Sequence, residues 1–77
     1  MTITTEAVAK LKAGEHGIVA HFTNDQMAGK LMSMGMLPGS EVEVVRVAPF
    51  KGGFYLKVDG NCIAIRVTEA ENIFLEI

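Results

Sequence analysis

The sequence has little of several residue types, and each scarcity excludes a class of protein. Its 77 residues contain a single cysteine, Cys62, so an intramolecular disulfide is excluded and a reducing compartment is favoured. No apolar run approaches the ~20 residues that a membrane-spanning helix requires. The first residues also lack the basic and apolar regions of a signal peptide. We therefore expect a cytoplasmic protein.

Positive charge is scarce as well. Seven Lys and Arg stand against nine Asp and Glu, which gives a formal net charge of -2. Non-specific nucleic-acid binding depends on a basic surface that neutralises phosphates, so no nucleic-acid partner is predicted. The hydrophobic fraction of 49% is sufficient for a compact core and argues against disorder. We expect one domain spanning residues 1–77, without an internal repeat or a linker.

A helix is predicted to begin near residues 23–26, where Thr-x-x-Gln forms a potential capping box, and to run to about residue 34. Met27, Leu31 and Met34 are spaced as one buried stripe of that helix, so we expect Met27 and Met34 to fill the core beside Leu31. Gly35 follows at the position where helices commonly end in a left-handed residue, and we expect it to need a positive φ.

A tight turn is predicted directly after this helix. Pro38 fixes its own φ and moves the preceding residue out of helical space, and Gly39 can supply the positive φ of a type II turn. Residues 41–44 then alternate acidic and apolar side chains as a half-buried strand does. The doublet Val44-Val45 shifts the phase of this alternation, which indicates a bulge or a sharp bend.

The rest of the chain predicts short elements separated by tight turns. Asp59-Gly60 between two apolar runs is a strong β-hairpin signal. The expected elements are a short helix over 6–11 with Val8 and Leu11 facing inward, a strand over 15–22, strands over 41–48, 54–58, 62–67 and 73–77, and a single helical turn over 68–71. Five short strands with such turns indicate a mainly β protein, a small antiparallel barrel with short helices inserted.

Several motifs resemble those of the FeoA family, the small ferrous iron transport protein A. The resemblance rests on Met-Gly-Met-Leu-Pro-Gly at residues 34–39 with Glu-Val-Glu-Val at 41–44, followed by Ala48-Pro49, Gly60, Ile-Ala-Ile-Arg at 63–66 and Glu69-Ala70. It extends from Leu11 to Ile77. The resemblance implies an SH3-like barrel with a helix between its first two strands.

The same resemblance implies a function. FeoA-like proteins are thought to be cytosolic accessory proteins of bacterial ferrous iron uptake that bind FeoB, a large membrane GTPase-permease. An alternative of another class is an SH3-like regulatory domain such as that of iron-dependent repressors. Family members often carry basic residues on the helix before Met34-Gly35, whereas residues 29–33 here offer only Lys30.

The sequence contains no arrangement typical of an enzyme or of a cofactor site. Cys62 stands among apolar residues of a predicted strand, so we expect it to be a small packing residue and not a nucleophile. No Gly-rich loop precedes a helix, as a phosphate site would require. His16, His21 and Cys62 are weak candidates for metal ligands. Because His16 and His21 are five positions apart on one strand, we expect them to face opposite sides and to define no preformed site.

Exposed apolar residues favour a protein partner. The candidate partner-binding residues are Met32, Met36, Leu37, Pro38, Phe50 and Tyr55. The turn around Leu37 and the loop around Phe50 flank the same strand, so they are expected at its opposite ends. If the bend at Val44-Val45 brought them together, Met32, Leu37 and Phe50 would flank one groove. The structural motif residues are Gly35, Pro38, Gly39, Asp59 and Gly60.

Overall fold

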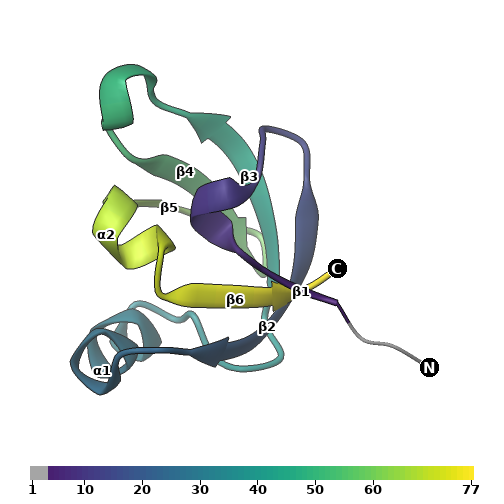
Figure 1. Cartoon of the computed structure of the whole chain (residues 1–77). Helices are drawn as coiled ribbons and strands as arrows, with labels where there is room; N and C mark the ends of the chain where they lie inside the picture. The colour runs from purple at the N-terminus through teal and green to yellow at the C-terminus, as the bar shows by residue number, and fades with distance from the viewer. Residues whose placement is uncertain (1–3) are drawn as a thin grey trace.

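Six antiparallel strands form one sheet in the order β1-β6-β2-β3-β4-β5 (Figure 1). The computed structural model describes residues 4–77, apart from the side chain of Lys51. The elements are β1 Thr5–Ala7, η1 Val8–Lys10, β2 His16–Phe22, α1 Asp25–Ser33, β3 Glu41–Val47, η2 Pro49–Lys51, β4 Phe54–Val58, β5 Asn61–Ile65, α2 Val67–Ala70 and β6 Ile73–Glu76. Within the described residues, no helix has the length and hydrophobicity needed to cross a membrane.

The sheet encloses a single core, and β3 is an interior strand that pairs with β2 on one edge and with β4 on the other. The first residues of β3 pair with β2, and the whole strand pairs with β4. The register with β4 shifts between Val44 and Arg46, so the bulge predicted at Val44-Val45 is confirmed. The enclosed buried residues are Val8, Leu11, Val19, Leu31, Met36, Val42, Val44, Phe54, Leu56, Val58, Ile65, Ala70, Ile73 and Leu75. The predicted mainly β, SH3-like fold is confirmed.

The helix predicted over residues 6–11 is wrong. Residues 5–7 form β1, which pairs with β6, and only the single 3-10 turn η1 follows. A helix of this length makes few internal hydrogen bonds, so pairing with an available sheet edge prevails. Val8 and Leu11 nevertheless face inward as expected. The sheet therefore has six strands and not five.

A bulge in β2 changes the expected direction of a histidine. Val19 is paired with Leu75 of β6, but the next pair is His21 with Phe74, which leaves Ala20 unmatched. Because of this extra residue, the His21 side chain points outward, on the same side of the strand as the His16 side chain. The expectation that these two histidines face opposite sides is therefore wrong.

The hairpin between β4 and β5 has the predicted turn. Asp59 and Gly60 have φ values of 47° and 89°, and both are positive, as a type I′ turn requires. The turn is also joined to the start of β3. Asp59 Oδ1 accepts a hydrogen bond from the Glu41 amide at 2.9 Å, and the Asp59 amide donates to the Glu41 carbonyl at 3.0 Å.

The inserted helix α1 begins one residue later than its predicted capping box. Asn24 is the N-cap, and its Oδ1 accepts hydrogen bonds from the amides of Gln26 and Met27. Thr23 instead uses its hydroxyl to donate to Asn72 Oδ1 at 2.7 Å. The helix is correctly predicted between the two strands, but the Thr-x-x-Gln box is not its cap.

Candidate partner-binding surface

The C-terminus of α1 ends in a Schellman motif. The Met36 amide donates to the Leu31 carbonyl at 3.0 Å, and the Gly35 amide donates to the Met32 carbonyl at 3.0 Å. Gly35 has a φ of 94°, as predicted. This motif usually brings the residue after the glycine against the helix residue five positions earlier, and both Met36 and Leu31 are fully buried.

Two assignments for the methionines are therefore wrong. Met36, a candidate partner-binding residue, belongs to the core and is not available at the surface. Met34, expected in the core, is exposed instead, whereas Met27 is half-buried against the core as expected. The signal was present in the sequence, since an apolar residue that directly follows a helix-ending glycine is typical of a Schellman motif.

The turn after Met36 is held by backbone hydrogen bonds. The Ser40 amide donates to the Leu37 carbonyl at 2.9 Å, and Ser40 Oγ accepts from the Leu37 amide. Gly39, with the predicted positive φ of 91°, donates its amide to the Val19 carbonyl of β2 at 2.8 Å. The turn is thus fixed to the sheet, while Leu37 remains 49% exposed and Pro38 is exposed.

Exposed apolar side chains gather around this helix end. We call them the hinge patch, and its members are Met32, Met34, Leu37 and Pro38. They extend from the last turn of α1 into a turn whose backbone is tied to β2. The backbone that carries these side chains therefore has little freedom to lose on binding.

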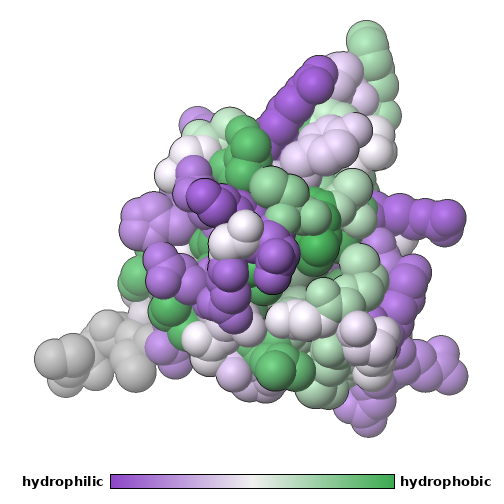
Figure 2. All heavy atoms as spheres, turned by 180° about the vertical axis from the view of Figure 1, so that it is seen from behind, coloured by the Kyte–Doolittle hydropathy of each residue, from purple (hydrophilic) through white to green (hydrophobic). Residues whose placement is uncertain are grey.

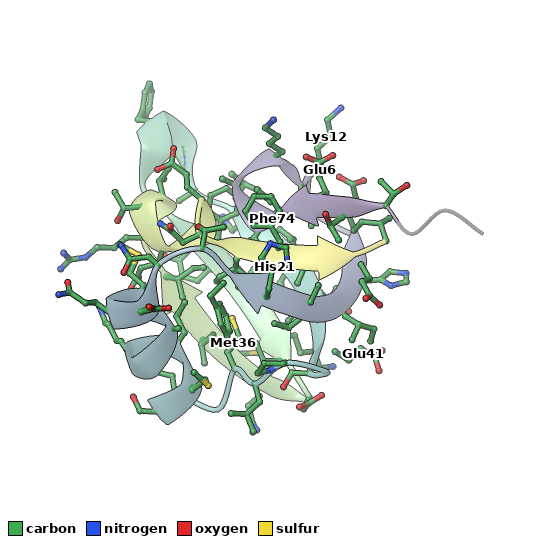
Figure 3. All side chains as sticks on the ribbon, turned by 60° about the horizontal axis from the view of Figure 1, so that its bottom comes forward. Glu6, Lys12, His21, Met36, Glu41 and Phe74 are labelled. Atoms are coloured by element: carbon green, nitrogen blue, oxygen red, sulfur yellow. The ribbon has the colours of Figure 1, made fainter. Side chains whose placement is uncertain are left out.

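Phe50 lies at the other end of the molecule. It is fully exposed in η2, between β3 and β4, and its φ is 57°. Figure 1 shows this loop at the top of the molecule and α1 with the following turn at the bottom; Figure 3 separates the same loop from the labelled Met36. The bulge in β3 bends the strand without joining its ends. The turn around Leu37 and the loop around Phe50 therefore lie at opposite ends of β3, as expected, and the groove that would have formed if the bend had brought them together is absent (Figure 1).

A separate open groove lies on the outer face of β3, β4 and β5. Its volume is about 430 Å³, and it is lined by Val45, Arg46, Tyr55, Leu56, Cys62, Ile63 and Ala64. The guanidinium carbon of Arg46 lies 5.9 Å from the centre of the half-exposed Tyr55 ring. Figure 2 shows the molecule from behind, where green apolar residues lie among purple polar ones. Cys62 is exposed in this groove, so its assignment to the core is wrong.

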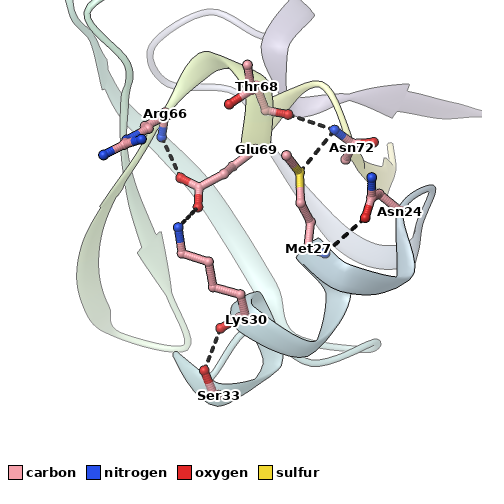
Figure 4. Close-up of polar contacts among 8 residues, drawn as sticks. All are labelled: Asn24, Met27, Lys30, Ser33, Arg66, Thr68, Glu69 and Asn72. Atoms are coloured by element: carbon pink, nitrogen blue, oxygen red, sulfur yellow. Dashed lines mark hydrogen bonds and ion pairs between the residues drawn. The ribbon is translucent and has the colours of Figure 1, made fainter.

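Lys30, the only charged residue in the segment 29–33, joins α1 to α2. Lys30 Nζ lies 2.6 Å from Glu69 Oε2, and Glu69 Oε1 accepts a hydrogen bond from the Arg66 amide at 2.8 Å (Figure 4). That amide hydrogen bond, followed by Lys30, lowers the pKa of the buried Glu69 carboxyl. The helical turn begins after Arg66, one residue before the predicted range. Lys30 is thus engaged within the molecule.

Asn72 forms further hydrogen bonds between α1, α2 and the end of β2. Its Nδ2 donates to the Thr68 carbonyl at 2.7 Å and to Met27 Sδ at 3.2 Å (Figure 4). Its backbone carbonyl accepts a hydrogen bond from the Thr23 amide. Asn72 therefore connects the end of α2, the end of β2 and the first turn of α1. These contacts hold α1 in a fixed position relative to the sheet.

The weak metal candidates are spread over two strands. His16 and His21 are exposed on β2, and the His21 ring stacks on Phe74 with centroids 5.0 Å apart and planes 3° from parallel. The labelled His21 and Phe74 overlap in Figure 3. Cys62 lies on β5, which is not a neighbour of β2 in the sheet. Across residues 4–77, no three His, Cys, Asp or Glu side chains are grouped so that they could hold a metal ion.

A comparison with protein-family models matches residues 7–77 to the FeoA domain. The chain belongs to the FeoA family. The match covers nearly all of the sequence, including the helix-ending glycine, the tight turn and the β4–β5 hairpin. A comparison with curated protein sequences found no match.

Solved structures agree with this family. A crystal structure of an iron uptake regulatory protein (FeoA) is 26% identical, with a TM-score of 0.84, over 95% of this chain and 97% of the other. An FeoA protein from Chlorobium tepidum is also 26% identical, with a TM-score of 0.80, over 94% of this chain and 70% of the other. A manganese-dependent transcriptional repressor shares the fold, with a TM-score of 0.88 at 20% identity, and this chain spans 43% of its length.

Proposed function

We propose that this FeoA-family protein is a non-enzymatic accessory protein of ferrous iron uptake. It acts by binding the cytosolic GTPase portion of a FeoB-type permease, and the hinge patch is its contact surface. The observation that carries the proposal is the family match over residues 7–77. Similar solved structures are described as an iron uptake regulatory protein and as an iron(II) transport protein A from Clostridium thermocellum.

The hinge patch suits a protein partner better than the other exposed apolar residues do. Leu37 is held by a turn bonded to β2, and Met32 and the C-cap Met34 lie at the end of a helix that contacts of Lys30 and Asn72 hold in place. Methionine side chains adapt their shape to a partner at small energetic cost. Phe50 and Tyr55, the remaining candidates, lie outside this patch, Phe50 in η2 and Tyr55 on β4.

The alternative function, a metal-responsive regulatory domain, is supported by likeness of fold alone. The manganese-dependent repressor has the same fold, but its sequence is only 20% identical. An SH3-like fold serves many functions, so the fold by itself does not transfer the repressor's role.

The test is equilibrium binding of the purified chain to the GTPase portion of the cognate FeoB-type protein. If the hinge patch carries the contact, Leu37→Ala lowers the affinity by roughly thirtyfold, the usual effect of removing a central anchor worth about 2 kcal/mol. Phe50→Ala is the matched control, because it removes an exposed apolar side chain from the opposite end of the molecule.

Three outcomes separate the possibilities. Loss of binding with Leu37→Ala but not with Phe50→Ala supports the hinge patch. The reverse result moves the contact to the loop between β3 and β4 and overturns the choice of surface. Absence of binding by the unaltered chain, with or without a GTP analogue on the GTPase, overturns the proposed function.

A further inference from the structure

The outer edge of β5 is open. β5 is the last strand in the sheet order, and within the described residues no strand pairs with its far side. The two-residue turn determines which residues of β5 form hydrogen bonds with β4. The pair that closes such a turn, Val58 and Asn61, exchanges two backbone hydrogen bonds, and every second pair after it does the same. Asn61, Ile63 and Ile65 therefore direct their amides and carbonyls toward β4. Cys62 and Ala64 direct theirs toward the open side.

The contacts of the neighbouring residues agree with this phase. A Cβ built on Gly53, just before β4, would lie 2.5 Å from the Ile65 carbonyl oxygen, which places that oxygen on the β4 side. Among the turns, loops and caps of the described chain, none forms a backbone hydrogen bond with Cys62 or Ala64. Both residues are exposed. Two amides and two carbonyls are thus available for a further strand.

This edge also lacks the features that prevent pairing. Open edges in soluble proteins are usually short, charged, interrupted by proline or covered. β1, the other edge strand of the sheet, is only three residues long and carries Glu6. β5 has the sequence Asn-Cys-Ile-Ala-Ile and contains neither a charge nor a proline. An uncharged open edge of this kind is typical of a site that accepts a strand.

The charges beside the edge indicate which strand it accepts. On the outer face, Lys57 is paired with Cys62, and Arg46 is paired with Tyr55, which is in turn paired with Ala64. Arg66 is exposed directly after β5. Of the neighbouring acidic residues, Glu43 is opposite Lys57 on β3, one strand farther from the edge, and the Asp59 carboxylate accepts a hydrogen bond from the Glu41 amide. Because Cys62 is small, the long side chain of Lys57 on the neighbouring strand can extend over it to the position of an added strand, and Arg66 lies at the end of the same edge.

The inner side of the edge is apolar. Ile63 is half-buried and packs against the core, and Ile65 is buried. A strand added beside β5 would place alternate side chains next to these two isoleucines and the others beside the basic residues. We propose that β5 binds an extended strand of a partner protein in which acidic and apolar residues alternate, with the acidic side chains facing Lys57 and Arg66.

This inference concerns a surface other than the hinge patch and does not require that the partner be a FeoB-type protein. The probe is a short capped peptide in which glutamate and valine alternate, titrated into the isotope-labelled chain and followed by NMR. We expect saturable shifts and slower exchange at the amides of Cys62 and Ala64. A peptide of alternating lysine and valine should bind about fivefold or more weakly, since a few exposed charge pairs contribute to affinity at low salt.

Backbone methylation of the peptide provides a matched control. The glutamates would lie opposite Cys62 and Ala64, so their amides face β5, whereas the valine amides face away. Methylation of the glutamate nitrogens should abolish binding, and methylation of the valine nitrogens should leave it unchanged. On the protein side, Ala64→Pro removes an open-side amide without removing a hydrogen bond to β4, because proline is tolerated at such edge positions.

Several results would overturn the proposal. They are equal binding of the acidic and basic peptides, unchanged binding after glutamate methylation, and shifts confined to the hinge patch. Shifts of Cys62 and Ala64 that depend on protein concentration without peptide would show that a second copy of the chain is the occupant. Should Ala64→Pro fail to fold, the methylated peptides decide the question on the unaltered protein. A chain that binds the transporter's GTPase but not the acidic peptide overturns this inference alone.

Discussion

Lys30 and Glu69 join α1 to α2 across a distance of 2.6 Å between Nζ and Oε2. The two side chains differ in environment, since that of Lys30 is 60% exposed and that of Glu69 is 7% exposed. The pKa of Glu69 is lowered first by the Arg66 amide and then by Lys30. The carboxylate is therefore held mainly by the backbone of its own helical turn, and the lysine adds a contact from α1.

The first prediction concerns the pH dependence of stability. Because the folded-state pKa of Glu69 lies below the ordinary value of 4.5, its contribution is fully present above that value and is lost as pH falls through the lowered pKa. At neutral pH, Glu69→Gln should reduce the free energy of unfolding by about 1–3 kcal/mol. Denaturant unfolding measured from neutral to acidic pH should show the difference between the two proteins shrinking as the carboxylate is protonated.

The control for this prediction is Lys30→Met, which removes only the exposed partner. It should cost about 1 kcal/mol or less, because solvent screens the charge on an exposed lysine. A larger loss from Lys30→Met than from Glu69→Gln would contradict the primary role of the Arg66 amide. A Glu69→Gln difference that stays constant at all pH values would contradict the lowered pKa.

The second prediction compares two glycines of the same helix region. Gly35 has a φ of 94° and Gly29 lies inside α1; a Cβ at either position would meet no atom within 4 Å. Gly35→Val should therefore destabilise the protein by about 1–2 kcal/mol through backbone strain alone. Gly29→Ala should stabilise it by roughly 0.5–1 kcal/mol, because alanine favours the helix. Thermal melts of both variants test the helix end, and no loss from Gly35→Val would contradict it.

The third prediction separates the methionines by burial. Met36 is fully buried against the core, so Met36→Ala should cost about 2–5 kcal/mol. Met32 and Met34 are exposed, and their replacement by alanine should change the stability by about 0.5 kcal/mol or less. Equal losses for all three, measured by denaturant unfolding, would show that Met36 does not occupy the core.

The fourth prediction concerns metal binding. His16, His21 and Cys62 are not grouped with other ligands among the described residues, and we expect the isolated protein not to bind Fe(II) tightly. Anaerobic titration calorimetry is the measurement. A stoichiometric sub-micromolar site that is removed by His21→Ala or by Cys62→Ser would prove this expectation wrong.

Local sequence patterns were sufficient to predict the turns and most of the strands. Gly35, Gly39 and the pair Asp59-Gly60 adopt the positive φ values that their positions predicted, because a tight turn depends on a few adjacent residues. The doublet Val44-Val45 likewise revealed the bulge in β3, since a change of phase is visible in the order of residues. The FeoA-like motifs lie in these same segments.

Burial and pairing between distant segments could not be obtained in this way. Cys62 stands among apolar residues yet is exposed, because β5 is an edge strand and its outward face has no covering layer. The bulge at Ala20 turned His21 outward through pairing with β6, more than fifty residues later in the chain.

The sequence by itself determined where the chain turns, which segments extend and which family the protein belongs to, since these depend on local backbone preference and short motifs. The tertiary structure alone decided that residues 5–7 pair with the last strand and that Cys62 is left exposed on an edge strand. It also decided that the hinge patch and Phe50 lie at opposite ends of the molecule. The physical reason is that burial and edge pairing depend on which surfaces meet when the sheet closes around its core.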